Sequence, residues 1–261
     1  MNTYGFIGCG NMGGILATCC AEAFPQNTLL CDHDNSKAAA LANQTGATAA
    51  EIEALATYCN YIFLGVKPQA LPAVLTELKP RLNERTVLVS MAAGVSIEKI
   101  KTIIPDHPVI RIMPNTPAAV GAGVILYCTD EDVTNEEIDG FLAALQNAGT
   151  LDLIDEKLID AASALSGCGP AFVYMFIEAL ADGAVKQGIP RDKALSYAAA
   201  TVMGAGKMVL KSKIHPEQLK DNVCSPGGST IAGVAALEEN AFRGAVISAI
   251  EASYKRTKEL G

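Results

Sequence analysis

The first 155 residues or so alternate between short apolar runs and stretches with helical periodicity. The apolar runs are rich in β-branched residues and nearly free of charge, which is typical of strands buried on both faces of a parallel sheet. We predict strands at 3–7, 28–31, 61–64, 86–91, 109–113 and 124–127, and helices between them at 12–23, 36–43, 69–78, 97–103 and 135–148. This alternation indicates an α/β fold with a Rossmann-type, doubly wound and mainly parallel sheet.

Beyond residue 155 the strand pattern ends, and long segments rich in Ala, Leu and Met follow. We predict helices there at 157–165, 171–187, 192–211, 217–223, 231–239 and 242–259. The stretch 171–181 is apolar nearly all round apart from Glu178, so a helix there must be covered on every side. We therefore expect a sheet domain at 1–154 and an all-helical oligomerisation domain at 155–261, with an ordinary monomeric core as the alternative.

Composition and charge narrow the classes of partner. Half of the residues are hydrophobic and 18% are charged, as in globular proteins. The net charge of -8 argues against nucleic acid, whose phosphates are bound by clustered Lys and Arg. We expect no metal site, because no cysteine pair has zinc spacing, and no membrane span, because no apolar run reaches about 20 residues. With no signal peptide expected, the eight cysteines fit a reducing cytoplasm.

A glycine-rich motif follows the first predicted strand. Gly8, Gly10 and Gly13 form the pattern G-x-G-x-x-G where a helix begins. In this context the pattern predicts a dinucleotide site: the first glycine makes a tight turn, the second lets the pyrophosphate approach, and the third lets the helix lie close to the strand. The helix that starts near Asn11 and Met12 would direct its N–H groups at the phosphates.

Asp32 ends the second predicted strand, at the position where dinucleotide sites carry an acidic residue. A carboxylate there accepts a hydrogen bond from the 2′-hydroxyl of NAD and repels the 2′-phosphate of NADP. The four polar residues that follow would reduce this repulsion: His33, Asn35, Ser36 and Lys37. The pattern therefore favours NADH and leaves NADPH open.

Other loops follow the next predicted strands, at the edge of the sheet where ligands bind. We expect cofactor contacts from residues in three of these loops: Val66, Lys67, Pro68, Ala92, Ala93 and Asn115. Lys67 is a candidate catalytic acid, although a solvated loop lysine is the interpretation that we favour. Asn115 stands close to two prolines and is either a fixed hydrogen-bonding amide or part of a structural turn.

The helical half contains a Ser-Pro-Gly-Gly-Ser-Thr turn at 225–230. Gly227 and Gly228 would expose several backbone N–H groups beside the start of a helix, which suits a small carboxylate. The alternative is a simple connection between helices, with Ser229 or Thr230 as the N-cap.

Together these motifs resemble the pyrroline-5-carboxylate reductase family over essentially the whole chain. The matching stretches are GFIGCGNMG (5–13), VKP (66–68), AAG (92–94), RIMPNTPA (111–118), SGCGPAFVYMFIEA (166–179) and DNVCSPGGSTIAG (221–233). The resemblance implies reduction of 1-pyrroline-5-carboxylate to proline with NAD(P)H as the cofactor. It also implies that the helical domain interlocks two subunits, so that each active site draws on both chains, and that dimers form larger assemblies.

The resemblance further implies roles for single residues. Thr230 matches the threonine that hydrogen-bonds the ring nitrogen of the substrate, and Asn222 matches a position near the cofactor. The substrate carboxylate would be held by the turn and its neighbours: Val223, Ser225, Pro226, Gly227, Gly228 and Ser229. The chain departs from the NADP-preferring members at 32–35, which lacks their Arg-rich or Ser/Thr-rich phosphate clamp.

Two other functions share part of this pattern. A β-hydroxyacid-type dehydrogenase also joins a Rossmann half to a helical half, but no Asn follows Lys207 at the spacing of its G-x-x-x-K-x-x-N pattern. A non-catalytic NAD(P)-binding regulator, with its cysteines as a redox sensor, would leave the turn at 225–230 unexplained.

Overall fold

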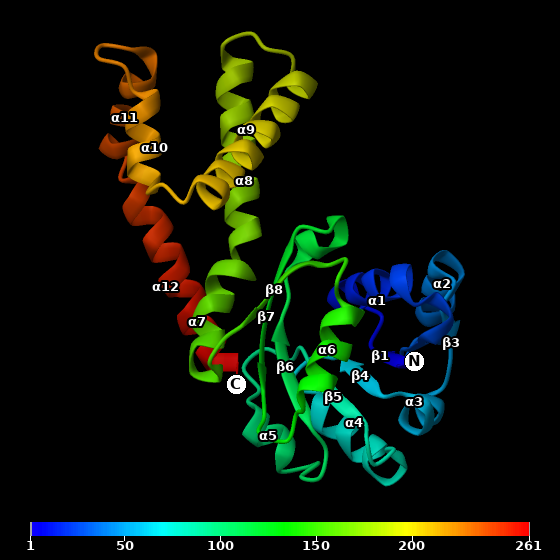
Figure 1. Ribbon diagram of the computed structural model, residues 1–261. Coiled ribbons are helices and arrows are strands. Elements are labelled where there is room, and N and C mark those ends of the chain that lie inside the picture. Colours follow the sequence, from blue (N-terminus) through cyan, green and yellow to red (C-terminus); the bar gives the residue numbers. More distant parts are fainter. Residues whose placement is uncertain (1, 261) are drawn as a thin grey trace. The chain divides into compact units, whose positions relative to one another are not determined.

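The computed structural model describes residues 2–260 (Figure 1). Its contacts divide the chain into two compact units, Met1–Cys168 with Ser253–Gly261, and Gly169–Ala252. We call them the sheet unit and the helical unit and describe each by itself. The division after Cys168 differs from the domain boundary expected at 154/155. That boundary stays a prediction of where the helical domain begins as a functional unit.

The sheet unit is built on one sheet of eight strands in the order β3-β2-β1-β4-β5-β6-β7-β8 within the described chain. All neighbouring strands are parallel except β6 and β7. The strands are β1 (Tyr4–Ile7), β2 (Thr28–Cys31), β3 (Thr48–Ala49), β4 (Tyr61–Leu64), β5 (Val87–Ser90), β6 (Val109–Met113), β7 (Gly123–Thr129) and β8 (Gly149–Leu153). The sheet order reverses direction between β1 and β4, as in Rossmann folds, so the predicted fold class is confirmed.

Helices cover both faces of this sheet. They are α1 (Asn11–Ala23), α2 (Asn35–Thr45), α3 (Ile52–Tyr58), α4 (Leu71–Leu78), α5 (Ile97–Lys101), α6 (Asn135–Ala144) and α7 (Glu156–Ser166), with short 3-10 turns η1 (Pro25–Asn27), η2 (Lys79–Arg81) and η3 (Thr116–Val120). One core cluster joins α1, α2 and α6 to one face, and the other joins α3, α4, α5 and α7 to the opposite face.

Alternation along β4 shows why most of the strands carry no charge. Tyr61 and Phe63 belong to one core cluster, while Ile62 and Leu64 belong to the other, so both faces of the strand are buried. Phe63 is in register with Phe6 of β1, and their rings stack with centroids 4.4 Å apart. Because both faces lie against helices, a charged side chain on either face would lose its hydration.

The sequence prediction missed three short elements, namely β3, α3 and β8. The helix predicted at 135–148 ends at Ala144, and β8 begins at Gly149, where φ is +132°. A Cβ on Gly149 would lie 2.2 Å from the carbonyl oxygen of Gly123. The strand is therefore set by its close pairing with β7, which local periodicity does not reveal.

Arg111 of β6 ties α7 to the sheet. It is 2% exposed, and its guanidinium donates to Glu156 Oε1 at 3.2 Å and to Asp160 Oδ1 at 2.5 Å. Glu156 Oε1 also accepts the backbone N–H of Ile97 at 2.8 Å, so α5 joins the same network. Ile159 of α7 is fully buried in the adjacent core cluster. These contacts explain why α7 belongs to the sheet unit although its sequence resembles the helical half.

The helical unit contains α8 (Gly169–Lys186), α9 (Arg191–Ser212), α10 (Pro216–Val223), α11 (Ser229–Glu239) and most of α12 (Phe242–Leu260). Figure 1 shows α8 and α9 as a hairpin, coloured green to yellow, and the two helices share a small core of Ala181, Ala194 and Ala198. Many large apolar side chains of the unit stay exposed, among them Met175 at 70% and Leu210 at 78%. Such a surface marks an interface, because an isolated soluble domain seldom leaves so many in water.

The expectation of no membrane-length apolar segment is wrong by length and composition. The helical stretch Glu156–Lys186 has a window of 18 residues with mean hydropathy 1.4, of which 11% is buried within the chain. One such helix is weak grounds for a membrane span. The part of this stretch in α8 belongs to the helical unit and adds to its exposed apolar surface.

We predict that Arg111→Met lowers the free energy of unfolding by about 3 kcal/mol. The change leaves the Glu156 and Asp160 carboxylates without their buried cation, and breaking one side of a buried ion pair costs this much. Urea unfolding measures the change. Arg256→Met, which removes an exposed pair with Glu259, is the control and should cost no more than about 0.5 kcal/mol. Equal effects of the two substitutions would contradict the role given to Arg111.

Candidate active site

The carboxyl ends of the parallel strands of the sheet unit meet at one edge, which is where ligands bind in folds of this kind. The loops after β1, β2, β4, β5 and β6 therefore lie along the same edge. These loops contain the cofactor residues predicted within the sheet unit, so the structure brings that group together on one side of the sheet.

Three glycines let the loops after β1 and β4 touch. Gly8 has φ of +94°, and a Cβ added to it would lie 2.6 Å from the carbonyl oxygen of Gly65. A Cβ on Gly13 would lie 1.9 Å from the carbonyl oxygen of Gly8, and one on Gly65 would lie 2.8 Å from that same oxygen. Each of the three positions thus excludes every side chain. The sequence prediction missed Gly65, although a glycine directly after a buried strand was the available signal.

Gly10 differs from these glycines because open space lies where its side chain would be. A Cβ on Gly10 would meet no atom within 4 Å, and Gly10 is the N-cap of α1 with no side-chain hydrogen bond to the helix. The first turn of α1 contains no acidic residue. The free N–H groups and the positive end of the helix dipole therefore face a space that a ligand can enter, and this fits the pyrophosphate of a dinucleotide.

Asp32 is fixed beside this turn. The residue is 6% exposed, and its carboxylate accepts the backbone N–H of Cys9 at 2.7 Å and of Asp34 at 2.9 Å. His33 Nδ1 lies 3.0 Å from Oδ1 of the same carboxylate. The neighbouring Cys9 thiol has its pKa raised to about 12, by burial first and then by the Asp32 charge, so it stays protonated.

A pocket of about 450 Å³ lies next to Gly8 and Asp32. Its lining combines predicted and unpredicted residues, namely Ile7, Gly8, Cys31, Asp32, His33, Asn35, Glu51, Ile52, Val66, Ala70, Val74 and Glu77. Glu51 and Glu77 come from segments that the sequence prediction did not connect with the site. They reach it because α3 and α4 pack on the same face of the sheet.

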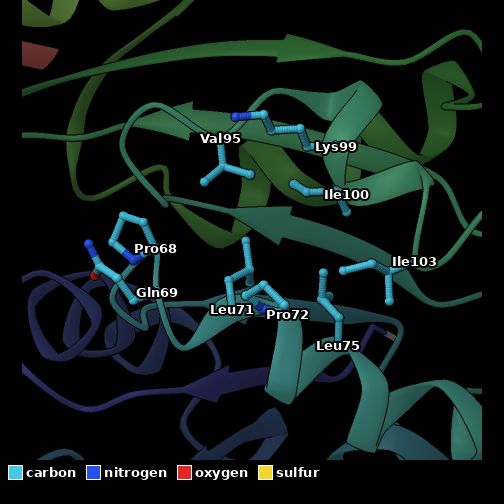
Figure 2. Close-up of a pocket in the computed structure, with 9 residues that line it drawn as sticks. All are labelled: Pro68, Gln69, Leu71, Pro72, Leu75, Val95, Lys99, Ile100 and Ile103. Carbon is cyan, nitrogen blue, oxygen red and sulfur yellow. The ribbon is translucent and has the colours of Figure 1, made fainter. Parts of the chain in front are cut away.

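The loop after β4 contributes Val66, Lys67 and Pro68. Val66 lines the pocket beside Asp32, while Lys67 is exposed and its carbonyl accepts the N–H of Ala70 at 2.9 Å. Pro68 borders a separate apolar groove of about 250 Å³ between α4 and α5 (Figure 2). In Figure 2 the leucine side chains of α4 face Ile100 of α5 and Ile103 beyond its end across this groove, whose lining includes neither Gly8 nor Asp32.

The loops after β5 and β6 behave differently from each other. Ala92 is 1% exposed and Ala93 half-buried, and Gly94 has φ of +74°, so this loop turns closely at the end of β5. The Asn115 amide donates to the Ser166 carbonyl at 2.9 Å and accepts the N–H of Val124 at 2.9 Å. Both ends of this buried amide are used within the chain, which favours the structural alternative for Asn115.

The predicted substrate turn lies in the helical unit, between α10 and α11. Gly227 has φ of +70°, and the N–H of Gly228 donates to the Ser225 carbonyl at 3.0 Å, which closes the turn. A Cβ on Gly228 would lie 2.4 Å from Ser225 Oγ. The helix begins at Ser229, its N-cap is Gly228, and no side chain caps it. The alternative in which Ser229 or Thr230 serves as N-cap is therefore wrong.

The side chains around this turn are open to solvent. Thr230 and Val223 are exposed, and within the described chain the Thr230 hydroxyl has no hydrogen-bond partner. Asn222 is also exposed and accepts from Gln218 Nε2 at 3.0 Å. The turn thus offers uncapped N–H groups of α11 and a free hydroxyl one residue inside the helix. Across residues 2–260, no three His, Cys, Asp or Glu side chains gather in a way that would hold a metal ion.

The chain is similar to known proteins over its whole length. It is 41% identical to the pyrroline-5-carboxylate reductase of Escherichia coli (strain K12), covering 98% of this chain and 97% of that one. It is 40% identical to the enzyme of that name from Pisum sativum, covering 99% and 96%. The chain belongs to the pyrroline-5-carboxylate reductase family.

Family models and solved structures agree with this membership. The model for pyrroline-5-carboxylate reductase dimerisation matches residues 156–260, and that for NADP oxidoreductase, coenzyme F420-dependent, matches residues 3–94. The structure of Plasmodium falciparum pyrroline carboxylate reductase with NADP bound is 34% identical with a TM-score of 0.89, covering 100% of this chain and 98% of that one. The Streptococcus pyogenes enzyme is 32% identical, also at 0.89, covering 99% and 98%.

We predict that Gly10→Ala weakens NADH binding by about tenfold or more while the free energy of unfolding changes by less than about 1 kcal/mol. The new methyl group meets no protein atom but enters the space through which a pyrophosphate approaches α1. Calorimetric titration and urea unfolding measure the two quantities. Gly13→Ala serves as the contrast, because its methyl group strikes the Gly8 carbonyl and should destabilise the fold itself. Unchanged NADH affinity in Gly10→Ala would place the pyrophosphate elsewhere.

Proposed function

We propose that this chain reduces 1-pyrroline-5-carboxylate to L-proline with NAD(P)H as the hydride donor. The observation that carries the proposal is the turn before α11, where two glycines precede a helix without a side-chain cap. Such a helix start offers N–H groups and a positive dipole end to an anion. The relatives named above carry this activity in their names, and the chain resembles them from end to end.

The turn and Thr230 suit the two polar groups of the substrate. The substrate carboxylate accepts from the N–H groups at the start of α11, with Ser225 and Ser229 hydroxyls nearby. The Thr230 hydroxyl lies within the first turn of α11 and forms a hydrogen bond with the ring nitrogen. Val223, Pro226, Gly227 and Gly228 shape the turn, and Asn222 contributes to cofactor binding.

The reaction needs no further acid or base from the protein beyond these groups and the cofactor site. When bound, NAD(P)H supplies the hydride, which forms a C–H bond at the imine carbon. The C=N π pair then moves onto a nitrogen that already carries its proton, and proline results. The remaining cofactor-binding residues are those of the sheet edge: Gly8, Gly10, Asn11, Met12, Gly13, Asp32, Val66, Lys67, Pro68, Ala92 and Ala93. Asn115 acts behind this edge by holding α7 and β7.

We further propose that the enzyme is a homodimer that builds larger assemblies and works in the cytoplasm without a membrane or nucleic-acid partner. The support for the dimer is the exposed apolar surface of the helical unit, together with the dimerisation model that matches residues 156–260. A groove of about 430 Å³ in this unit is lined by residues of α8, α11 and α12. All eight cysteines are free thiols, which suits a reducing compartment.

The reductase proposal is tested by mixing purified protein with 1-pyrroline-5-carboxylate and either NADH or NADPH. We expect cofactor oxidation and proline formation in equal amounts. Thr230→Ala should lower kcat by about 10- to 100-fold, the effect of one lost hydrogen bond to a charged group, and should leave NADH affinity unchanged. Thr230→Ser keeps the hydroxyl and should retain most of the activity.

Two results would contradict this proposal. Absence of turnover with either cofactor would exclude the reductase function. Near-normal turnover in Thr230→Ala would show that the hydroxyl has no part in the reaction, even if the rest of the turn binds substrate.

The dimer proposal predicts at least a dimer by light scattering. Met175→Glu should shift the protein toward monomer, because this side chain is 70% exposed within one chain and lies in the apolar groove of the helical unit. Tyr58→Glu, at an apolar position 69% exposed on the sheet unit, is the matched control and should leave the mass unchanged. An active wild-type monomer would contradict the dimer.

A further inference from the structure

The pocket beside Asp32 carries three carboxylates and no strong cation. Asp32, Glu51 and Glu77 line it, and none of the other residues around its volume of about 450 Å³ is Lys or Arg. In a sheet of this order, the adenosine ribose of a bound dinucleotide lies at the end of the second strand, next to the glycine turn. The pocket therefore occupies the place where a 2′-hydroxyl or a 2′-phosphate would lie.

The orientation of the Asp32 carboxylate is fixed by hydrogen bonds. Its two oxygens accept the backbone N–H groups of Cys9 and Asp34, at 2.7 and 2.9 Å, so the carboxylate is held from both sides. Oδ2 accepts one described hydrogen bond and keeps a lone pair for another donor. A ribose hydroxyl can donate to that lone pair, whereas a phosphate oxygen has no proton to give at neutral pH.

The polar residues after Asp32 do not form a phosphate clamp. The Ser36 hydroxyl donates to Asp34 Oδ1 at 2.6 Å, and His33 Nδ1 lies 3.0 Å from Asp32 Oδ1. Two of the four groups expected to reduce the repulsion of a phosphate are thus engaged by carboxylates, and of the other two only the uncharged Asn35 lines the pocket. Lys37 lies outside the lining of the pocket.

The Cys31 thiol, which lines the pocket, indicates that the electrostatic potential there is negative. The pKa of Cys31 is raised to about 11, by burial first and then by the charges of Glu51, Asp32 and Glu77. The same charges that disfavour a thiolate there disfavour a phosphate, which carries about two negative charges at neutral pH. The Plasmodium falciparum relative has NADP bound, so the shared fold leaves the choice to the residues of this lining.

We propose that this enzyme selects NADH over NADPH, with Asp32 accepting the adenosine 2′-hydroxyl and Glu51 and Glu77 repelling a 2′-phosphate. The inference rests on the proposed function, since it takes the sheet edge as the site of a nicotinamide cofactor. Asp32 acts by direct contact with the ribose. The two glutamates act through the field that they add to the pocket.

Binding measurements test this selectivity independently of turnover. Calorimetric titration of the full chain at low salt should show NADH binding about tenfold tighter than NADPH, or more. ADP-ribose should exceed 2′-phospho-ADP-ribose in affinity by a similar factor. The difference should narrow as salt rises, because exposed carboxylates such as Glu51 and Glu77 are screened. Steady-state rates with both cofactors should follow the same order.

Substitutions distinguish the direct contact of Asp32 with the ribose from the electrostatic repulsion by Glu51 and Glu77. Asp32→Asn should weaken NADH binding and bring the two affinities to within about threefold. The double variant Glu51→Gln with Glu77→Gln alters exposed side chains and should fold normally. It should tighten NADPH binding by about two- to fivefold more than it tightens NADH binding. Glu84→Gln removes one negative charge at an exposed turn outside the pocket lining and should alter neither affinity.

The outcomes distinguish failure of the inference from failure of the proposed function. Equal binding, or tighter binding of NADPH by the wild-type chain, would overturn the inference and leave the reductase intact. An unchanged affinity ratio in the double variant would remove the glutamates from the proposal. If no nucleotide bound at all, the cofactor site itself would be wrong, and the reductase proposal would fall with it.

Discussion

The close contact between the loops after β1 and β4 is the constraint on which the cofactor edge depends. Gly8, Gly13 and Gly65 meet through backbone atoms alone, and a methyl group at any of them would strike a carbonyl oxygen. This contact brings the start of α1 against the sheet at the point where the strand order reverses. The helix dipole and the free N–H groups then point at the same space as the end of β2. Without the three glycines, α1 would move outward and the anion site would separate from Asp32.

Buried polar side chains join the next layers to that edge. Asp32 reaches back to the glycine turn through the Cys9 N–H, so the ends of β1 and β2 share one carboxylate. Arg111 and Asn115 act farther along the sheet, where they hold the two ends of α7 through Glu156, Asp160 and the Ser166 carbonyl. Each of these groups is costly to bury, and each forms at least one hydrogen bond with another segment of the chain. The same chemistry that suggests a ligand site in the sequence thus also serves to join elements.

The two units differ in how far they bury their own apolar side chains. The sheet unit covers both faces of its strands with its own helices and forms two large apolar clusters. The helical unit buries three alanines in its own core and leaves leucines, methionines and tyrosines in water. Burial of each such side chain is worth about 1.5–3 kcal/mol, so the exposed set is a strong drive toward association. This difference fits a cofactor edge carried by the sheet unit and an apolar surface for association carried by the helical unit.

Local chemistry let the sequence alone determine much of this protein. Apolar runs of four to six residues, charged only at Arg111, predicted six strands, because burial on two faces tolerates little charge, and the glycine spacing predicted the turn before α1. The long helices from 156 onward were likewise visible in their apolar periodicity. Tertiary structure decided what depends on distant partners: β8 exists because Gly149 fits against Gly123, and Gly65 matters because Gly8 and Gly13 press on it. The uses of Asn115 and Ser36, and the meeting of Glu51 and Glu77 with Asp32, also came from packing, since no local pattern records which side chains the fold brings together.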